Sequence, residues 1–310
     1  LRYARHSPTI LAQLVRTAAY SAAGSALWAL LPVIGQQRLG LGAEGFGLLM
    51  GCLGTGAVAV GLVIGPLRHR VGLEPLVNAS GVLFAAVMLT AAFSRWPLPV
   101  YGALVVGGAC WMAVMSTFNT ATQTSAPPWV RSRATALHVL SALGSFALGS
   151  AFWGAVAGIG GLQTALLLAA ALMLAGLSLA KWFPLRMGEA HDVTQVAPFE
   201  DLLVPDPPDP EAGPVAVELG YRIRPEDTAA FLDAVSQLRA PRQRDGATFW
   251  RIYRDLGDPS RYVERFIVTS WADYLHQRAR ATLADQALEE QVRGFVVDGQ
   301  VTMQHYIAER

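Results

Sequence analysis

The first 187 residues of this chain contain almost no acidic side chains. Glu44 and Glu74 are the two acids there, against eleven Lys and Arg, whereas residues 188–310 hold 21 acids and thirteen basic residues. Charged groups are penalised inside lipid, so a stretch this long and this poor in charge excludes an ordinary soluble domain and is typical of membrane-spanning helices. The net charge of +1 therefore averages two regions with different surroundings, and it predicts no nucleic-acid partner.

Cysteine and lysine are also scarce. Cys52 and Cys110 both lie in apolar runs, where a thiol behaves as a small buried hydrophobe. Two such thiols exclude a disulfide framework and offer no metal-ligand spacing, and we expect no cofactor. Lys181 is the one lysine among 24 basic residues, which indicates a GC-rich bacterial genome rather than a mechanism.

The chain also lacks an initiating methionine. It starts at Leu1, and Arg2 and Arg5 precede an apolar run that is far longer than that of a signal peptide. We therefore expect that the beginning of a longer protein is missing.

One long uncharged stretch stands out among the residues that are present. Between Phe46 and Leu67 there is no charged side chain, and at a rise of about 1.5 Å per residue this stretch spans the roughly 30 Å hydrocarbon core of a bilayer. Small residues let neighbouring helices approach closely in a membrane. This stretch is rich in them, with Gly47, Gly51, Gly54, Gly56, Gly61 and Gly65.

Six apolar segments predict a six-helix membrane domain over residues 1–186. Their approximate bounds are 10–34, 45–67, 75–93, 98–122, 134–158 and 161–183. Basic residues stay on the cytoplasmic side, and here the basic turns alternate with turns that carry little charge. We therefore expect a bacterial inner-membrane protein with both ends of the chain cytoplasmic and residues 158–161 outside.

The remaining residues predict a linker and a soluble domain. Residues 187–213 are rich in proline and acids, with too little apolar matter to form a core. From residue 214 to 310 the periodicity predicts the order β-α-β-β-α-β, which fits a ferredoxin-like α+β domain of the dimeric barrel type. Both faces of its strands carry apolar residues, so we expect a homodimer through residues 214–310 or a second face covered by the membrane domain.

Several motifs resemble a known transporter family. The turn 65–72 looks like the second copy of the loop motif of the major facilitator superfamily, with His69 where an acid is usual. Segments 119–134 and 148–154, and segments 270–278 and 284–289 in the tail, are similar to the facilitator subgroup called transmembrane secretion effectors, which includes the enterobactin exporter. The resemblance implies the C-terminal half of a secondary exporter whose N-terminal six-helix half is its partner in the bilayer.

The resemblance also places candidate residues for a substrate cavity. In the facilitator fold the first, second, fourth and fifth helices of this half line the central cavity. Polar or aromatic residues on or near these helices are Tyr20, Trp28, Asn119, Gln123 and His138. Each also fits ordinary hydrogen bonding between helices. Arg16, near a cytoplasmic end, is expected to extend its charge out to the interface.

Candidate gating residues lie in two basic turns on the cytoplasmic side. Contacts there would break and re-form during alternating access, although basic residues also serve orientation alone. The candidates are Gly65, Arg68, Arg70 and Gly72 in the first turn, and Arg131 and Arg133 in the second.

The tail raises an alternative function. Trp271, His276 and Arg278 invite comparison with a membrane-tethered enzyme similar to antibiotic-biosynthesis monooxygenases, although a lone His on a charged helix is usually solvated. Six helices are more than an anchor needs. We therefore expect a non-enzymatic antiporter that exports a small siderophore-like or drug-like molecule, with a regulatory or dimerising tail.

Overall fold

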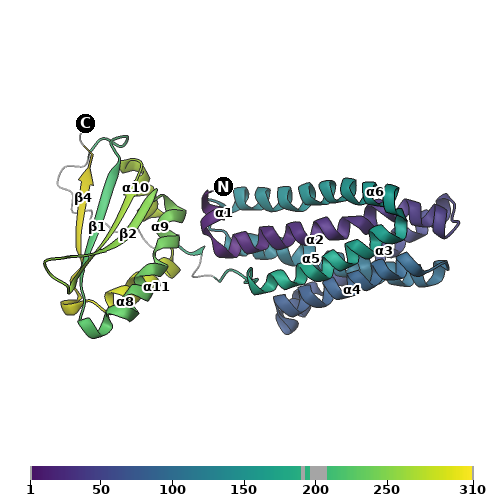
Figure 1. The fold of residues 1–310 in the computed structure, drawn as a ribbon, viewed down its shortest axis with the longest axis horizontal. Coiled ribbons are helices and arrows are strands. Elements are labelled where there is room, and N and C mark those ends of the chain that lie inside the picture. The colour runs from purple at the N-terminus through teal and green to yellow at the C-terminus, as the bar shows by residue number, and fades with distance from the viewer. Residues whose placement is uncertain (1, 190–192, 196–207, 309–310) are drawn as a thin grey trace. The chain divides into compact units, whose positions relative to one another are not determined.

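A computed structural model shows two compact units, residues 9–188 and residues 1–8 together with 189–310. The structure describes residues 2–189, 193–195 and 208–308, so most of the predicted linker lies outside the described residues. Figure 1 shows the first unit as a bundle of long helices and the second as a sheet with helices.

The first unit contains five helices that are long and apolar enough to cross a membrane, counted over the described residues. They begin with α2 (Pro8–Val33), which continues through a π-helical turn at Ile34–Arg38. The other four are α3 (Ala43–Val71), α4 (Leu73–Phe93), α5 (Pro97–Ser125) and α6 (Arg131–Leu177), the last followed by a 3₁₀ turn at Ser178–Lys181.

The predicted fifth and sixth segments are joined in α6. Gly161 has φ 83° and ψ 161°, so two helical arms meet at a single non-helical residue rather than at a loop. Glycine has no Cβ and adopts this conformation without a steric penalty. The second arm returns in the opposite direction (Figure 1). The count of five, against six predicted segments, follows from this one-residue turn.

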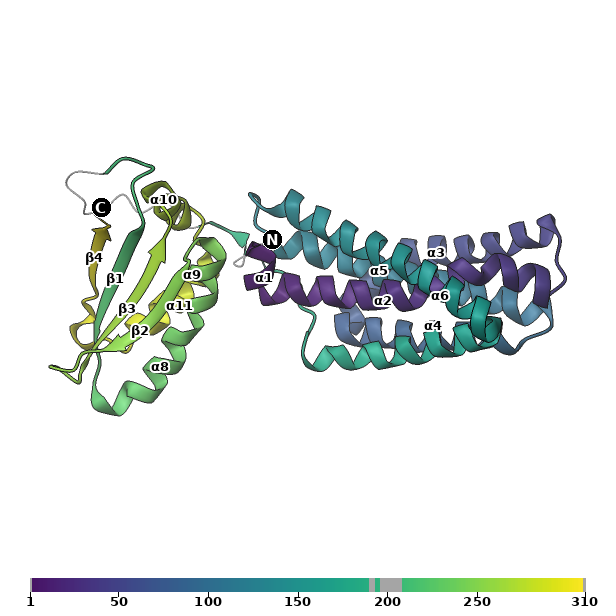
Figure 2. The ribbon, with the colours of Figure 1, turned by 45° about the horizontal axis from the view of Figure 1, so that its top comes forward.

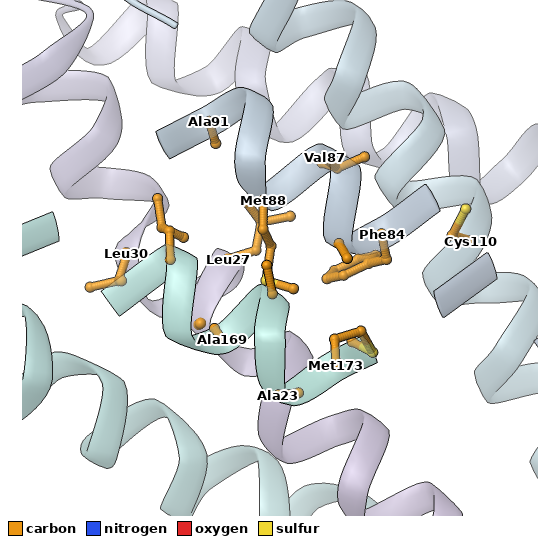
Figure 3. Packing of buried hydrophobic residues seen from close by; sticks show 14 of the residues in the cluster. Ala23, Leu27, Leu30, Phe84, Val87, Met88, Ala91, Cys110, Ala169 and Met173 are labelled. Carbon is orange, nitrogen blue, oxygen red and sulfur yellow. The ribbon is translucent and has the colours of Figure 1, made fainter. Parts of the chain in front are cut away.

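Buried apolar side chains from α2, α3, α4, α5 and both arms of α6 form the core of the first unit, part of which is drawn in Figure 3. Leu27 on α2, Phe84 and Met88 on α4, and Ala169 and Met173 on α6 pack together there. Two glycines of the unit lie against large side chains: a Cβ on Gly24 would lie 2.6 Å from the ring of Trp111, and one on Gly81 would lie 2.6 Å from the side chain of Leu177.

Glycine decides how α3 and α5 cross. A Cβ on Gly56 would lie 1.8 Å from the carbonyl oxygen of Val105, and one on Gly108 would lie 1.9 Å from that of Leu53. The close approach expected from the glycines of α3 therefore holds at Gly56. A Cβ at Gly47, Gly51, Gly54 or Gly65, in contrast, would meet no described atom within 4 Å.

The second unit is built on a four-stranded antiparallel sheet in the order β2-β3-β1-β4. Its strands are β1 (Val215–Arg222), β2 (Phe249–Arg254), β3 (Arg261–Val268) and β4 (Thr302–Ile307). Helices α8 (Thr228–Gln237), α9 (Arg239–Asp245), α10 (Trp271–Ala279) and α11 (Leu283–Arg293) cover one face (Figure 2), and the short α1 (Arg2–His6) packs on α9.

The predicted order β-α-β-β-α-β has one helix between its third and fourth strands, whereas the structure has two there, α10 and α11. Thr282 begins α11 with a capping box: its hydroxyl accepts from the backbone N–H of Asp285, and the Asp285 carboxylate accepts from that of Thr282. A reciprocal cap satisfies two backbone donors and sets a helix start.

The sheet face away from the helices has a polar centre. Glu218 pairs there with Arg265, whose guanidinium lies 5.8 Å from the ring centre of Tyr253. The register sets apolar rows on both sides of this pair, with Ile267 and Phe249 in one row and Val263 and Tyr253 in the other. The face that the sequence predicts to be an apolar patch is therefore mixed.

Candidate functional site

An aromatic cluster around Trp111 occupies the middle of the first unit, which we call the membrane unit. The Trp111 ring centre lies 5.7 Å from that of Tyr20, 5.8 Å from that of Phe84 and 5.9 Å from those of Trp28 and Phe146. Two predicted cavity residues, Tyr20 and Trp28, thus meet through Trp111. Sequence reasoning missed Trp111, because an aromatic residue in an apolar run carries no signal that separates it from the core.

Several polar atoms along α2 and α5 are buried without a partner. Among the described residues, none forms a hydrogen bond with the hydroxyl of Tyr20, the indole N–H of Trp28, the hydroxyl of Thr117 or the side-chain oxygen of Gln13. Such an atom costs roughly 1–3 kcal/mol when it stays unpaired, so each one requires an explanation. Water or a bound molecule would supply the missing bonds.

A small cavity opens beside Tyr20. It measures about 10 Å³, and its walls come from α2, α4, α5 and the second arm of α6, including Arg16, Phe118 and Met173. A buried water needs roughly this volume. In this conformation, the site beside Tyr20 has room for one water and not for a substrate.

The other predicted cavity residues lie elsewhere on the bundle. Asn119 and Gln123 are exposed on one side of α5, where the amide of Gln123 donates to Asn119 Oδ1 at 3.1 Å. His138 on α6 is buried, with Nδ1 3.5 Å from the hydroxyl of Thr17 on α2. The structure therefore does not bring these three residues into the aromatic cluster.

An ion pair between a buried arginine and a half-buried glutamate joins three segments at one end of the bundle. Arg16 on α2 donates to Glu74 on α4 at 2.6 Å, although its side chain is only 2% exposed, and Glu74 also accepts from the backbone N–H of Leu185 after α6. Arg16 was expected to extend its charge to the interface; the structure pairs it with Glu74, whose side chain is 30% exposed in the first turn of α4. The feature of the sequence that could have predicted this ion pair was the rarity of acids in this region.

The predicted gating residues of the first basic turn occupy different surroundings. Arg68 is half-buried, and its Nη1 makes no hydrogen bond with the described part of the chain, whereas Arg70 is exposed. Gly72 has φ 83° and separates α3 from α4. Gly65 is half-buried, and a Cβ there would meet no described atom within 4 Å.

In the second basic turn, both arginines are exposed. The Nε of Arg131 donates to the carbonyl oxygen of Ala126 at 3.2 Å, which fixes that side chain to the preceding turn. Arg133 lies at the start of α6 with its side chain toward the outside of the unit. The hydrogen bond of Arg131 and the ion pair of Arg16 with Glu74 share no residue.

The tail residues divide between core and surface. Trp271 is buried, with its ring centre 5.3 Å from that of Tyr274 and 6.0 Å from that of His305. His276 is exposed on α10, and Arg278 is half-buried. His276 and Trp271 therefore do not share a site.

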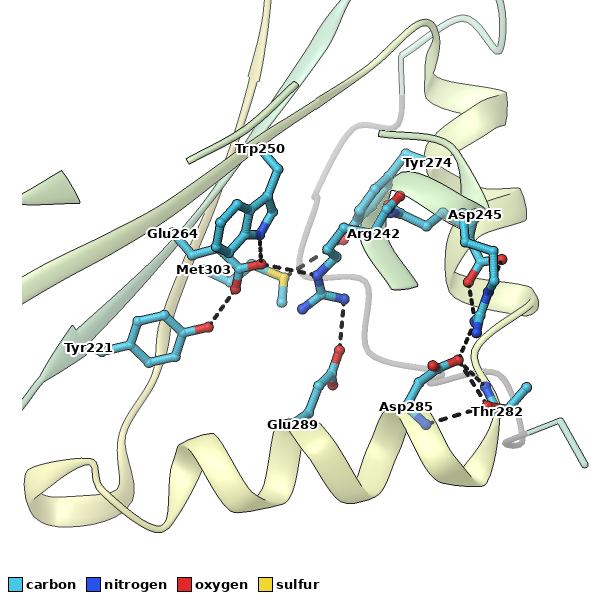
Figure 4. A network of polar contacts seen from close by, with 12 residues as sticks. Tyr221, Arg242, Asp245, Trp250, Glu264, Tyr274, Thr282, Asp285, Glu289 and Met303 are labelled. Carbon is cyan, nitrogen blue, oxygen red and sulfur yellow. Dashed lines mark hydrogen bonds and ion pairs between the residues drawn. The ribbon is translucent and has the colours of Figure 1, made fainter. Parts of the chain in front are cut away.

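Sequence reasoning missed a buried ionic network in the second unit (Figure 4). Glu264 is fully buried on β3 and accepts from the Tyr221 hydroxyl at 2.7 Å, the Trp250 indole N–H at 2.9 Å and Arg242 Nε at 3.2 Å. Arg242 also donates to Glu289 at 2.7 Å. Burial by itself lowers the pKa of Arg242, but the two carboxylates outweigh it and raise that pKa above its usual value.

Comparison with known proteins assigns the whole chain to one family. A family model described as transmembrane secretion effector matches residues 1–310, which includes both units. No curated protein matches the chain.

Proposed function

The chain belongs to the transmembrane secretion effector family, and from this premise we propose that it exports a small molecule across a bacterial inner membrane by alternating access. The family is of the major facilitator type, so the protein is a multi-pass membrane transporter and not an enzyme. The substrate class that we propose is siderophore-like or drug-like, and the exchange mode is antiport.

The observation that carries this proposal is the set of unpartnered polar atoms around the Trp111 cluster. The rings of Tyr20 and Trp28 pack against Trp111. The hydroxyl of Tyr20 and the indole N–H of Trp28 are buried and form no hydrogen bond with another described residue. Ligand sites combine apolar and aromatic walls with a few polar groups that fix orientation. We infer that the cavity beside Tyr20, which has room for one water, is the closed form of a substrate site. This site would open during transport.

We propose that α6 crosses the bilayer twice, so that the unit has six spans. Its arms, residues 131–160 and 162–177, run in opposite directions from Gly161 (Figure 1). An arm of 16 residues at about 1.5 Å per residue reaches about 24 Å, and the 3₁₀ turn that follows extends it toward the roughly 30 Å core.

The partner that we propose is a second six-helix bundle that packs on α3. In the most apolar stretch of α3 only 17% of the residues are buried, against 61% in α2. The exposed side of α3 carries Gly47, Gly51 and Gly54, and small residues of this kind support close packing of another helix.

For gating, we propose that the Arg16–Glu74 pair closes the cytoplasmic end, together with Arg68, Arg70, Arg131 and Arg133. The pair joins α2, α4 and the segment after α6, so a rocking motion that separates these elements breaks it. Gly65 and Gly72 in the adjoining turn would accommodate the backbone change.

We propose that the second unit is a cytoplasmic ferredoxin-like domain with a regulatory or dimerising role. The succession of strands and helices, and the sheet order β2-β3-β1-β4, support this fold. The apolar rows beside the Glu218–Arg265 pair support a self-complementary contact, which would cover Phe249 and Tyr253.

Tyr20→Phe is expected to slow export about three- to tenfold, because a hydrogen bond to substrate of about 0.5–1.5 kcal/mol is lost while the ring packing remains. A susceptibility panel of toxic compounds and siderophores on a deletion strain identifies a substrate, and its efflux is then measured in cells that express each variant. Phe93→Leu, at a side chain 57% exposed on α4, is the matched control and keeps wild-type efflux. Equal efflux by Tyr20→Phe and wild type for every substrate found would contradict the proposed cavity.

Single cysteines are expected to report opposite sides of the membrane for the two units. In a background with Cys52 and Cys110 replaced by Ala, a cysteine at Gly160 should react with an impermeant maleimide on intact cells. A cysteine at Leu256, which is 93% exposed in the second unit, should react only after the cells are opened. Labelling of Leu256→Cys from outside would reverse the proposed topology.

A further inference from the structure

A cavity of about 40 Å³ lies inside the second unit, between the sheet and helices α10 and α11. Leu219, Phe266 and Met303 contribute its wall on the sheet side, and Gln277 and Glu289 contribute polar groups from the helices. A buried water needs roughly 10–15 Å³ of this volume, so the cavity has room for about three waters or for one end of a small molecule.

Gln277, which lines this cavity, has one side-chain atom without a hydrogen bond to the described residues. Gln277 is 6% exposed, and its Nε2 donates to the carbonyl oxygen of Arg242 at 3.1 Å, which fixes the orientation of the amide. Its Oε1 accepts no hydrogen bond from the described residues. A buried acceptor left in this state is costly and rare, so a donor inside the cavity would explain it.

Three charged residues line the cavity: Arg242 and Glu289 are paired with each other, and Arg278 also has a partner. Arg242 donates from Nη1 to Glu289 at 2.7 Å and from Nε to Glu264 at 3.2 Å, as Figure 4 shows. A charged ligand would have to compete with these paired groups and lose its own hydration in a buried site. This arrangement favours an uncharged ligand.

The rest of the wall is aromatic or polarizable. The rings of Phe266 and Tyr274 line the cavity with the thioether of Met303. The hydroxyl of Tyr274 lies 2.7 Å from Nε2 of His305, and its ring packs against those of His305 and Trp271, so it is held in place. Aromatic faces and thioethers make favourable contacts with a flat ring.

We propose that this cavity binds a small uncharged aromatic molecule that carries a hydroxyl or amino group, which donates its hydrogen bond to Oε1 of Gln277. The ring packs against Phe266, Tyr274 and Met303. All of these residues belong to the second unit, so the site stands independently of the cavity proposed in the membrane unit. Ligand binding there would couple a cytoplasmic small molecule to the state of the transporter.

Phenol, anisole and benzoate test the chemistry of the site. The full chain in lipid nanodiscs is titrated with each compound, and hydrogen exchange is read in peptides from α10 and α11. Phenol is expected to protect these peptides with a Kd of about 1 mM, a free energy in keeping with so few atoms. Anisole, which lacks the donor, and benzoate, which is charged, are expected to bind at least tenfold more weakly.

Two variants locate the site. Gln277→Met removes the acceptor at similar volume, and Ala281→Leu fills the cavity without changing a polar group, so each is expected to weaken phenol protection at least tenfold. Gln304→Met, on the exposed face of β4, is the matched control and keeps wild-type protection. Ala281→Leu also provides the test if Gln277→Met fails to fold.

Three results would overturn the proposal. The first is equal protection by phenol and anisole, or stronger protection by benzoate, because either shows that the donor and the neutral charge do not matter. The second is phenol protection that survives Ala281→Leu, which places binding elsewhere. The third is the absence of protection at about 20 mM phenol, which is far above the expected Kd.

Discussion

Glu264→Gln is expected to lower the free energy of unfolding of the second unit by about 3–5 kcal/mol at pH 7. The substitution keeps the volume but removes the charge that a fully buried site offers to Arg242, Tyr221 and Trp250. Removing one partner of a buried pair leaves the other charge poorly compensated, and measured costs are of about this size. Glu289 still contacts Arg242 but does not reach the position of Glu264.

The measurement is hydrogen exchange of β1 and β3 peptides in the full chain, because the slowest amides of a core strand report the global free energy of unfolding. Glu218→Gln is the matched control: the same substitution on the neighbouring strand removes the pair with the half-exposed Arg265, and it should cost about 1 kcal/mol or less. If the two variants lose the same free energy, the buried network does not dominate the stability of this unit.

Gly56→Ala is expected to destabilise the membrane unit by about 3 kcal/mol, because a Cβ there would overlap with the carbonyl oxygen of Val105. Overpacking usually costs about 1–3 kcal/mol, and the upper end applies where the obstacle is backbone that no rotamer change can move. The unfolding midpoint in a detergent titration with sodium dodecyl sulfate measures the loss. Gly108→Ala should behave alike, since a Cβ there would enter the carbonyl oxygen of Leu53 at the same crossing.

Gly54→Ala is the control for this prediction. It lies two residues from Gly56 on α3, makes the same chemical change, and its Cβ would meet no described atom within 4 Å. Alanine is the better helix former, so when this chain is measured without the proposed partner bundle, this variant should be as stable as wild type or slightly more stable. The double variant Gly56→Ala/Gly108→Ala should cost less than the sum of the single variants, because both disrupt one helix crossing. Equal midpoints for Gly54→Ala and Gly56→Ala would show that α3 and α5 do not cross here.

The sequence alone was sufficient to predict the features that depend on the spacing of apolar residues along one helix or strand. Apolar length located the membrane helices, and alternation of apolar and polar residues predicted four strands within residues 214–310, where the structure has a four-stranded sheet. These patterns are local because a helix or strand repeats its burial every 3.6 or two residues. In β3, Glu264 lies on the same side as the buried Tyr262 and Phe266, so an acid in this alternating run was a signal for an internal partner that sequence reasoning did not use.

Tertiary structure alone decided which distant residues meet. Arg16 and Glu74 are 58 positions apart, and Arg242 and Glu289 are 47 apart, so no spacing rule connects either pair. Trp111 became the centre of an aromatic cluster, and Gln277 acquired a buried oxygen without a partner among the described residues, only through the packing of separate elements. The physical reason is that pairing and cavity shape depend on how whole helices and strands fit together, whereas hydrophobic period depends only on the side of one element that is buried.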